Sequence, residues 1–130
     1  MSELPAALRP GAVSRWTRAI TEDDVARFAE LSGDRGRHHL ERDERGRLMA
    51  HGLLTATLPT KLGGDMDYIA RTMEFEFLKP VYAGDVLTCD GAVVASAAQS
   101  ARYKVRFAFE VRNQDGELVM RGNSAGQVAR

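Results

Sequence analysis

The chain has 130 residues, of which 44% are hydrophobic and 28% are charged, a balance typical of one soluble globular domain. This composition excludes a disordered chain and a collagen-like chain. Eighteen Lys and Arg residues balance eighteen Asp and Glu residues, so we expect neither nucleic acid nor an anionic membrane as a partner. A chain without net charge is weakly protected from self-association, which fits an oligomer.

Cysteine content and hydropathy bear on the compartment. Cys89 is the single cysteine, so the fold does not depend on an intrachain disulfide. Residues 1–10 lack the basic start and apolar run of a secretory signal, and no apolar run approaches the roughly 20 residues that span a bilayer. We expect a cytoplasmic protein without membrane attachment.

The first third of the chain predicts an arm, a strand and a helix. Residues 1–11 contain two prolines and little periodicity, so we expect a loose arm, followed by a short strand over residues 12–20. Thr21 can cap a helix whose first turn is acidic and which ends near Ser32 and Gly33. Its apolar face comprises Val25, Phe28 and Ala29.

A charged segment and an uncharged segment follow. Residues 34–47 are dense in charge and glycine and predict an exposed loop, which holds His38 and His39. Residues 48–58 are almost uncharged and predict a buried central helix with one stripe of leucines at positions 54, 58 and 62. We expect Pro59 to kink this helix and Gly63 and Gly64 to end it through left-handed backbone.

The second half of the chain alternates with the period of strands. Strands are expected around residues 72–77, at 86–95, at 103–111 and at 117–128, with a hairpin loop at 113–116. These elements predict an α+β domain in which one curved antiparallel β-sheet wraps around a long central α-helix. Because one sheet covers only part of an apolar helix, the remaining cover should come from neighbouring segments or a second subunit. The aromatic side chains expected in the core are Phe75, Phe77, Phe107 and Phe109.

Four segments stand in the order and spacing of a known family: residues 28–34, His39, residues 50–54 and residues 77–85. Over residues 20–94 the chain thereby resembles the MaoC-like, (R)-specific enoyl-CoA hydratase family of hotdog proteins. The resemblance implies a single hotdog domain over 1–130 that forms a homodimer or a dimer of dimers. It also implies reversible hydration of 2-enoyl thioesters of coenzyme A or acyl carrier protein to (R)-3-hydroxyacyl thioesters, without a cofactor.

The resemblance also assigns candidate site residues. Hydration of a conjugated thioester needs a held water, groups that move its proton, and donors to the enolate-like oxygen. Asp34 and His39 match the catalytic pair of the family, and Gly52 matches the position whose backbone N–H polarises the thioester carbonyl. That N–H would be unpaired at the start of a helix, where the helix dipole assists it. Thr60 aligns with a small hydroxyl residue that supports the catalytic groups.

The chain departs from the family motif between the two catalytic positions. The family has an Asn-Pro pair where this chain has Gly36 and Arg37. A flexible glycine and a cation replace a rigid, hydrogen-bonding turn, so the motif alone does not fix the placing of Asp34 against His39. In isolation, Asp34 would be read as a turn cap and His39 as a solvated loop histidine.

Three further sets of residues have competing interpretations. His51 is expected to be a buried, hydrogen-bonded histidine beside the substrate rather than a third catalytic group. Arg37 belongs to a set of arginines that either bind phosphates of the thioester carrier or form a solvated loop face, two readings of similar weight. The other members are Arg35, Arg42, Arg45 and Arg47.

We expect no metal site, because adjacent histidines tend to point apart and no pair of ligands repeats at a fixed spacing. The residues considered were His38, His39, His51, Asp34 and Cys89. Two functional alternatives remain open at this point. A thioesterase would use the same fold and oxyanion donor on the tetrahedral intermediate of acyl transfer. A non-catalytic acyl-thioester-binding protein would bind without turnover.

Overall fold

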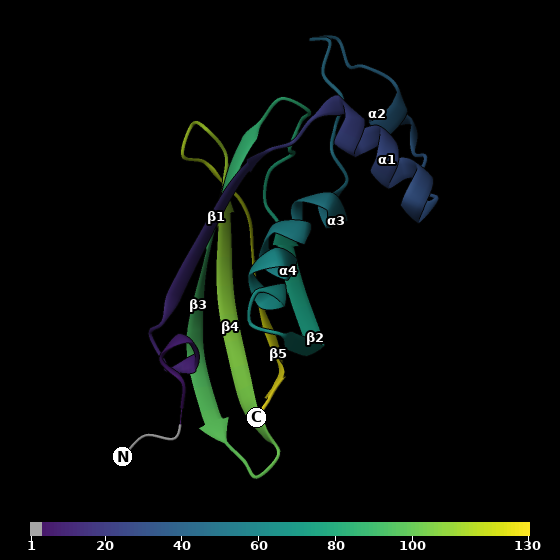
Figure 1. Ribbon diagram of the computed structural model, residues 1–130. Coiled ribbons are helices and arrows are strands. Elements are labelled where there is room, and N and C mark those ends of the chain that lie inside the picture. Colours follow the sequence, from purple (N-terminus) through teal and green to yellow (C-terminus); the bar gives the residue numbers. More distant parts are fainter. Residues whose placement is uncertain (1–3) are drawn as a thin grey trace.

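The computed structural model describes residues 4–130 and consists of one antiparallel sheet with helices on one face and at one end (Figure 1). The sheet order is β1-β3-β4-β5-β2, so β1 and β2 form its two edges. The strands are β1 (Val13–Ala19), β2 (Tyr68–Phe77), β3 (Val86–Ala98), β4 (Arg102–Arg112) and β5 (Leu118–Ala129). Each of the four expected strands after residue 67 is therefore present.

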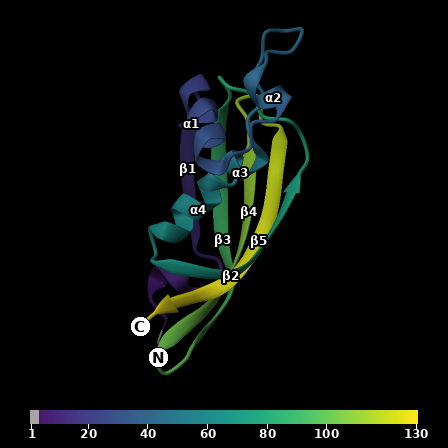
Figure 2. The ribbon, with the colours of Figure 1, turned by 90° about the vertical axis from the view of Figure 1, so that its right-hand side faces the viewer.

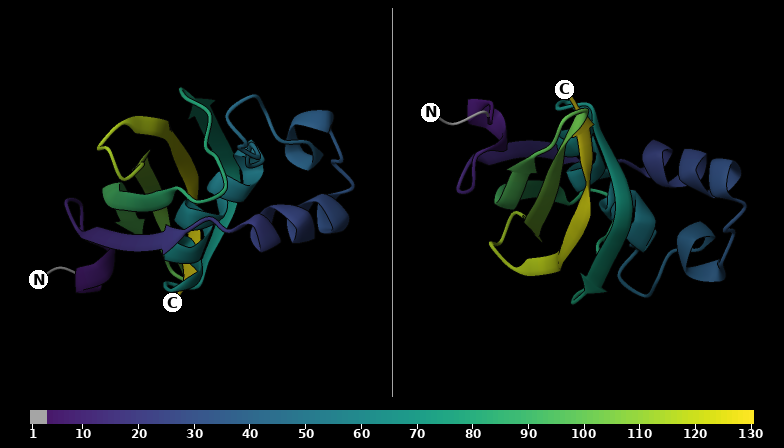
Figure 3. Two further views of the ribbon diagram at one scale, coloured as in Figure 1. Left: turned by 90° about the horizontal axis from the view of Figure 1, so that it is seen from above. Right: turned by 90° about the horizontal axis from the view of Figure 1, so that it is seen from below.

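The helices lie against the concave side of the sheet and beyond its end (Figure 2). In the views from above and below, the sheet curves around the central helices (Figure 3). The α+β class and the sheet wrapped around a helical element are confirmed. The helical segments are η1 (Ala6–Leu8), α1 (Glu22–Ser32), α2 (Arg37–Leu40), α3 (Gly52–Thr55) and α4 (Thr57–Gly64).

The first helix begins and ends where local chemistry predicts. Thr21 Oγ1 accepts the Asp24 N–H at 3.0 Å, and the Asp24 carboxylate accepts the Thr21 N–H at 2.9 Å, which completes a reciprocal capping box. At the other end Gly33 adopts a left-handed conformation with φ of 77°. The expected helix is confirmed at both ends.

The expected central helix is present, together with the disruption that Pro59 predicts. It is divided at Ala56 into α3 and α4, because Pro59 has no N–H to bond the carbonyl of Thr55. The leucine stripe at positions 54, 58 and 62 is buried as expected, but Leu53 and Lys61 on the opposite face are exposed. The helix is therefore amphipathic, with one uncovered face.

The end of α4 also differs from expectation. Neither Gly63 nor Gly64 has a positive φ; the left-handed residue after the helix is Asp67, at φ 56°. The chain turns tightly there and enters β2 at Tyr68. The connection between α4 and this edge strand is therefore short.

The amino-terminal arm is not loose over the residues that the structure describes. Leu8 is buried in a satellite core with side chains of β3, β4 and β5, and the Gly11 N–H donates to the Val93 carbonyl at 2.8 Å. Residues 4–11 therefore cover the lower end of the sheet. The part of the expected arm at 1–3 lies outside the described residues.

Two further expectations about exposure are wrong. The segment 34–47 is not wholly an exposed loop, because it folds into α2 and buries His39 to 6% exposure. Of the aromatic residues assigned to the core, Phe107 and Phe109 are buried and Phe75 is half-buried, but the Phe77 side chain is 53% exposed. Phe77 lies near the end of an edge strand, where no further strand covers it.

The single cysteine belongs to the main core. Cys89 is fully buried on β3, and burial raises the pKa of its thiol to about 12. The thiol therefore stays protonated and behaves as a small apolar side chain. Among residues 4–130, no helix is long and apolar enough to cross a membrane.

The division of the central helix into a buried and an exposed face predicts a contrast between two identical substitutions. Leu58→Ala removes a fully buried side chain and should lower the free energy of unfolding by about 2–5 kcal/mol. Leu53→Ala, on the exposed face, should change it by less than about 0.5 kcal/mol. Urea unfolding followed by circular dichroism measures both values, and equal losses would contradict the burial described.

Candidate active site

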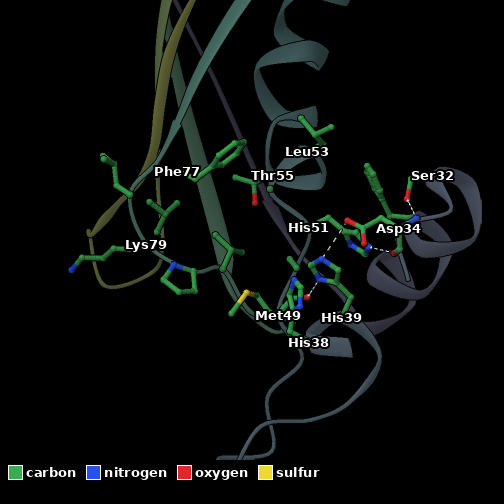
Figure 4. Close-up of a pocket in the computed structure, with 17 residues that line it drawn as sticks. Ser32, Asp34, His38, His39, Met49, His51, Leu53, Thr55, Phe77 and Lys79 are labelled. Carbon is green, nitrogen blue, oxygen red and sulfur yellow. Dashed lines mark hydrogen bonds and ion pairs between the residues drawn. The ribbon is translucent and has the colours of Figure 1, made fainter. Parts of the chain in front are cut away.

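The two residues of the expected catalytic pair face each other at one end of the sheet (Figure 4). Asp34 follows the cap of α1, and His39 lies on α2, five residues later. Asp34 Oδ2 is 3.6 Å from His39 Nε2. That separation is too long for a good hydrogen bond between the two atoms, yet both can contact one water placed beside them.

The hydrogen bonds of His39 fix which nitrogen faces Asp34. His39 Nδ1 is 2.7 Å from the Met49 carbonyl oxygen, which can only accept a hydrogen bond. The neutral ring therefore carries its proton on Nδ1 and presents the Nε2 lone pair to the cavity. A buried imidazole held in this tautomer is ready to accept a proton from water.

The Asp34 carboxylate has two separate contacts. Its Oδ1 accepts the Gly36 N–H at 3.1 Å, which closes the turn, and its Oδ2 faces His39. Acceptance of the Gly36 N–H lowers the pKa of Asp34 below its usual value, and the neighbouring histidines lower it further. One carboxylate oxygen of Asp34 can therefore close the turn while the other remains available for catalysis, so the two interpretations are compatible.

Gly36 is compatible with this geometry because it has no side chain. A Cβ at this position would lie 3.1 Å from His38 Cε1 and 3.3 Å from Asp34 Oδ1. Gly36, which stands where the family motif has asparagine, thus makes room for the His38 ring. His38 and His39 do not point apart as expected; their ring centroids are 3.9 Å apart. His38 also lines the cavity.

His51 connects the loop to the central helix. It is 3% exposed, and its Nε2 donates to the Asp34 carbonyl oxygen at 2.9 Å. One face of its ring stacks on His39, with centroids 3.6 Å apart, and the other face stacks on Phe28 at 4.9 Å. His51 Nδ1 is buried without a hydrogen-bond partner among the described residues. The expectation of a buried, hydrogen-bonded histidine is confirmed in this respect.

The same three side chains offer ligand atoms within 4.8 Å of one another: Asp34, His39 and His51. The two imidazole planes are within 17° of parallel at 3.6 Å, so the in-plane lone pairs of the two rings do not converge on one point. In addition, His51 Nε2 already donates to a carbonyl. The donor set therefore fits stacked, hydrogen-bonded histidines better than a metal centre.

Gly52 begins α3 and lines the same cavity as Asp34 and His39. As the first helical residue, its N–H has no acceptor within the helix, and none is found among residues 4–130. A Cβ at this position would lie 2.8 Å from a ring carbon of Phe77. Glycine is therefore required for the Phe77 ring to lie against the start of the helix.

Thr60 is not part of this site, contrary to expectation. It is exposed, its hydroxyl donates to the Ala56 carbonyl at 3.0 Å, and it does not line the cavity that contains Asp34. Thr55 occupies the cavity wall instead. Thr55 lies three residues after Gly52, on the same helix face. Thr60 lies five residues further along, which turns its side chain by about 140° around the helix axis. Helical spacing from Gly52 could have identified Thr55.

Arg37 is also outside the cavity. Its side chain points into solvent, with Nε 3.6 Å from Glu41 Oε2. Most of its neighbours in the arginine set are paired with acids as well, which favours the solvated interpretation of these charges. The pairs are Arg35 with Glu30, Arg42 with Glu22, and Arg47 with Asp43.

These residues surround an open cavity of about 530 Å³. One side carries the polar groups of the α1–α2 turn and of His51, and the other carries apolar side chains from β2 and from the segment that follows it (Figure 4). A concave, mostly apolar space with a few convergent polar groups is the usual form of a small-molecule site. The apolar lining includes Leu53, Phe77, Leu78, Pro80, Val81 and Val119.

Comparison with known proteins places the chain in a family. The sequence profile of the thioesterase superfamily matches residues 48–120. A 3-hydroxybutyryl-CoA dehydratase of Methylorubrum extorquens is 31% identical over 118 residues, which cover 80% of this chain and 74% of the relative. The chain belongs to the MaoC-like hydratase branch of the hotdog superfamily.

Solved structures support this assignment. An R-hydratase of Pseudomonas aeruginosa is 29% identical, with a TM-score of 0.83 over 95% of this chain and 83% of that one. An (R)-hydratase of A. caviae is 25% identical, with a TM-score of 0.84 over 95% of this chain and 99% of that one. A MaoC-like dehydratase of Rhodospirillum rubrum, at 23% identity and a TM-score of 0.77 over 95% and 94%, shares the fold. The hotdog fold is thereby confirmed.

The two contacts of the Asp34 carboxylate predict a pH-dependent contribution to stability. Because the pKa of Asp34 is lowered in the folded state, its ionised form stabilises the fold above the unfolded pKa, and this is lost as pH falls through the folded value. Asp34→Asn should therefore lower the melting temperature at pH 7, with a difference that closes towards about pH 3.

Asp115→Asn is the matched control. Asp115 lies in the exposed β4–β5 turn, and its carboxylate takes part in no hydrogen bond among the described residues. Thermal unfolding of both variants between pH 3 and pH 7 measures the effect. An Asp34→Asn difference that stays constant with pH would contradict the proposed role of the ionised carboxylate.

Proposed function

We propose that this protein catalyses the reversible addition of water to 2-enoyl thioesters, which yields (R)-3-hydroxyacyl thioesters. The observation that carries the proposal is the convergence of Asp34 and His39 at one end of a cavity that also contains the free N–H of Gly52. The named relatives, a dehydratase and two (R)-hydratases, support the reaction class. The enzyme is a hydro-lyase and needs no redox chemistry.

The chemistry assigns one task to each group. A water held between Asp34 Oδ2 and His39 Nε2 attacks carbon 3 of the substrate, and His39 Nε2 accepts the proton that the water loses. The second hydrogen stays on the water oxygen and donates a hydrogen bond to the Asp34 carboxylate, whose negative charge also stabilises the imidazolium. The imidazolium then returns the proton to carbon 2, so the elements of water are added without a net proton change.

The negative charge that develops on the thioester oxygen needs donors. The Gly52 N–H is available for this purpose, and the Thr55 hydroxyl lies in the same wall of the cavity. The four-residue length of α3 leaves the N–H itself as the principal contribution, with less from the helix dipole than a long helix would supply. His51 would hold Asp34 and His39 in register with this donor.

The substrate is an acyl thioester, and we propose coenzyme A or acyl carrier protein as its carrier. A thioesterase would require water to attack the carbonyl carbon instead of carbon 3. The stacked His39 and the paired Asp34 are compatible with either attack, but the named relatives favour hydration. Cytoplasmic location and the single-domain organisation over residues 1–130 stay predictions.

We further propose a homodimer that forms along β2. This edge strand is ten residues long, pairs with β5 on one side only, and exposes large apolar side chains. An unpaired apolar edge is an aggregation hazard unless another strand covers it, and a second copy can do so with two-fold symmetry. The exposed apolar residues along this edge are Ile69, Met73, Phe77 and Leu78.

A single assay tests the reaction. Purified protein should reduce the enoyl absorbance of crotonyl-CoA without release of free thiol, measured in the same sample.

Asp34→Asn and His39→Gln should each lower kcat by about 10²–10⁴-fold, the usual contribution of a general acid–base group. Because the two residues act on one water, the double variant should be little slower than the slower single variant.

His39→Gln is preferred to His39→Ala because His39 is buried in the histidine stack, and truncation would leave a cavity. The Asp115→Asn variant serves as the control for the charge change. Thiol release would indicate a thioesterase, and tight binding without either signal would indicate a binding protein. Normal turnover by both single variants would refute the assignment of the catalytic pair.

The proposed dimer predicts the effect of a charge on the β2 edge. Ile69→Lys should weaken dimerisation by at least about tenfold, because an unpaired buried charge costs more than about 1.4 kcal/mol. Val94→Lys on β3, a similarly exposed apolar position away from that edge, is the control. Light scattering after size-exclusion chromatography measures the change; equal behaviour of the two variants would argue against this interface.

A further inference from the structure

The face of the sheet turned away from α3 and α4, which we call the outer face, is covered by no helix or loop of residues 4–130 (Figure 3). It holds two hollows, of about 590 Å³ and about 510 Å³. The charged residues of β4 that line them alternate with Phe107 and Phe109, which are buried in the core. The proposed reaction uses neither hollow.

The larger hollow lies towards the active-site end of the sheet and is acidic. Asp90 and Glu110 are direct partners on β3 and β4, so like charges lie opposite each other, which disfavours the isolated chain. Two arginines line this hollow as well, and each is already paired with an acid. A net negative charge therefore remains in this acidic hollow. Its four acids are Glu74, Glu76, Asp90 and Glu110.

The smaller hollow lies at the other end of the same strands and is basic. Arg71, Lys104 and Arg106 line it, and no acid does. None of these three side chains makes an ion pair or a hydrogen bond within residues 4–130. Elsewhere on the sheet the pairs are Arg15 with Asp90, Arg112 with Glu110, and Arg121 with Glu76. The cations of the basic hollow are thus left without a counter-charge on their own chain.

The floors of both hollows consist of small side chains. Ala92 and Ala108 lie in the acidic hollow, and Ala95, Ala97 and Ala125 lie in the basic hollow. Such floors admit the long side chains of a second sheet while the two sheets pack at the usual distance of about 10 Å. Five strands of about ten residues present roughly 20 by 33 Å, or about 650 Å². Two chains side by side exceed the about 800 Å² per partner of a stable interface.

The arrangement of the two hollows is self-complementary in the proposed dimer along β2. Antiparallel pairing of β2 with its copy reverses the strands of the partner, so each acidic hollow lies beside a basic hollow of the partner. The outer face of the dimer then carries four areas of alternating sign. A two-fold axis in the plane of this face, along or across the strands, sets every acidic hollow of one dimer opposite a basic hollow of another.

We propose that the outer face binds a second copy of the protein, so that two dimers pack back to back as a tetramer through their oppositely charged hollows. The inference goes beyond the proposed reaction and uses only the proposed dimer along β2. The facing copy supplies the counter-charges that Arg71, Lys104 and Arg106 lack within their own chain.

Salt dependence is the first test, measured by light scattering after size-exclusion chromatography. The protein should be a tetramer at about 0.01 M salt, where the Debye length is about 30 Å, and a dimer at about 1 M salt, where it is about 3 Å. The β2 edge should survive at high salt, because apolar contacts and backbone hydrogen bonds hold it.

Charge reversal is the second test. Lys104→Glu with Arg106→Glu makes both hollows negative, and Glu74→Lys with Glu110→Lys makes both positive. At low salt each double variant should remain a dimer, with the tetramer dissociation constant raised at least about tenfold, because faces of like charge repel. An equimolar mixture of the two should recover the tetramer, since a negative dimer can pack against a positive one.

The matched control is Arg27→Glu with Arg45→Glu. It changes the net charge as much as the first double variant does, but on α1 and on the loop before α3. This control should stay tetrameric at low salt, and cooperative thermal unfolding of all variants checks that they fold.

Ile69→Lys separates the two interfaces. With the β2 edge disrupted, the protein should form an outer-face dimer at low salt and a monomer at high salt. Val94 is the extra residue of the β3 bulge, beside the basic hollow, so its lysine variant reports on the β2 edge only at high salt.

A wild-type protein that stays dimeric at low salt would overturn the inference, and so would a tetramer that persists at high salt and in both double variants. Binding of inorganic pyrophosphate to a protein that stays dimeric would assign the basic hollow to an anionic ligand and also overturn it. None of these measurements uses turnover of crotonyl-CoA, so failure of the proposed reaction leaves the test intact.

Discussion

The hydrogen bond from His51 to the Asp34 carbonyl is the contact that joins the two halves of the site. It spans 17 residues and connects the turn after α1 with the residue before Gly52. The His51 ring simultaneously supports His39 by stacking. Among residues 4–130, His51 Nδ1 has no hydrogen-bond partner, and a buried unsatisfied group costs about 1–3 kcal/mol. Stacking on His39 and Phe28 nevertheless holds the His51 ring in place, so Asp34, His39 and Gly52 keep fixed relative positions.

The departure from the family motif changes how the turn is built without separating Asp34 from His39. A rigid Asn-Pro pair would order the turn through its own side chain and ring. Here the Asp34 carboxylate orders it by accepting the Gly36 N–H, and the absent side chain of Gly36 leaves room for His38. One oxygen of Asp34 thus closes the turn, and the other faces His39. The replacement of Asn-Pro by Gly36 and Arg37 is therefore compatible with an Asp34 that faces His39.

Interactions between residues close in the sequence were sufficient to predict several elements of the fold. The capping box of α1, the alternation of β4 and the turn before β5 follow from neighbouring residues. Burial of His39 depends on the contact with Met49 and His51, which the loop sequence does not contain. The misplacement of Thr60 arose because the helix divides at Ala56 and because helical phase, rather than motif order, decides which hydroxyl faces the cavity. Tertiary contacts therefore decided the site residues that the sequence misplaced.

The partly exposed Phe77 ring links site geometry to assembly. It lies so close to Gly52 that a Cβ there would displace the ring, and it forms one wall of the cavity that holds the free N–H. In the monomer its outer surface faces solvent beside the open edge of β2. A second copy on that edge would cover the ring and keep bulk water, other than the reacting water, out of the cavity, which strengthens each electrostatic contact inside it. The same apolar surface would then serve both dimerisation and catalysis.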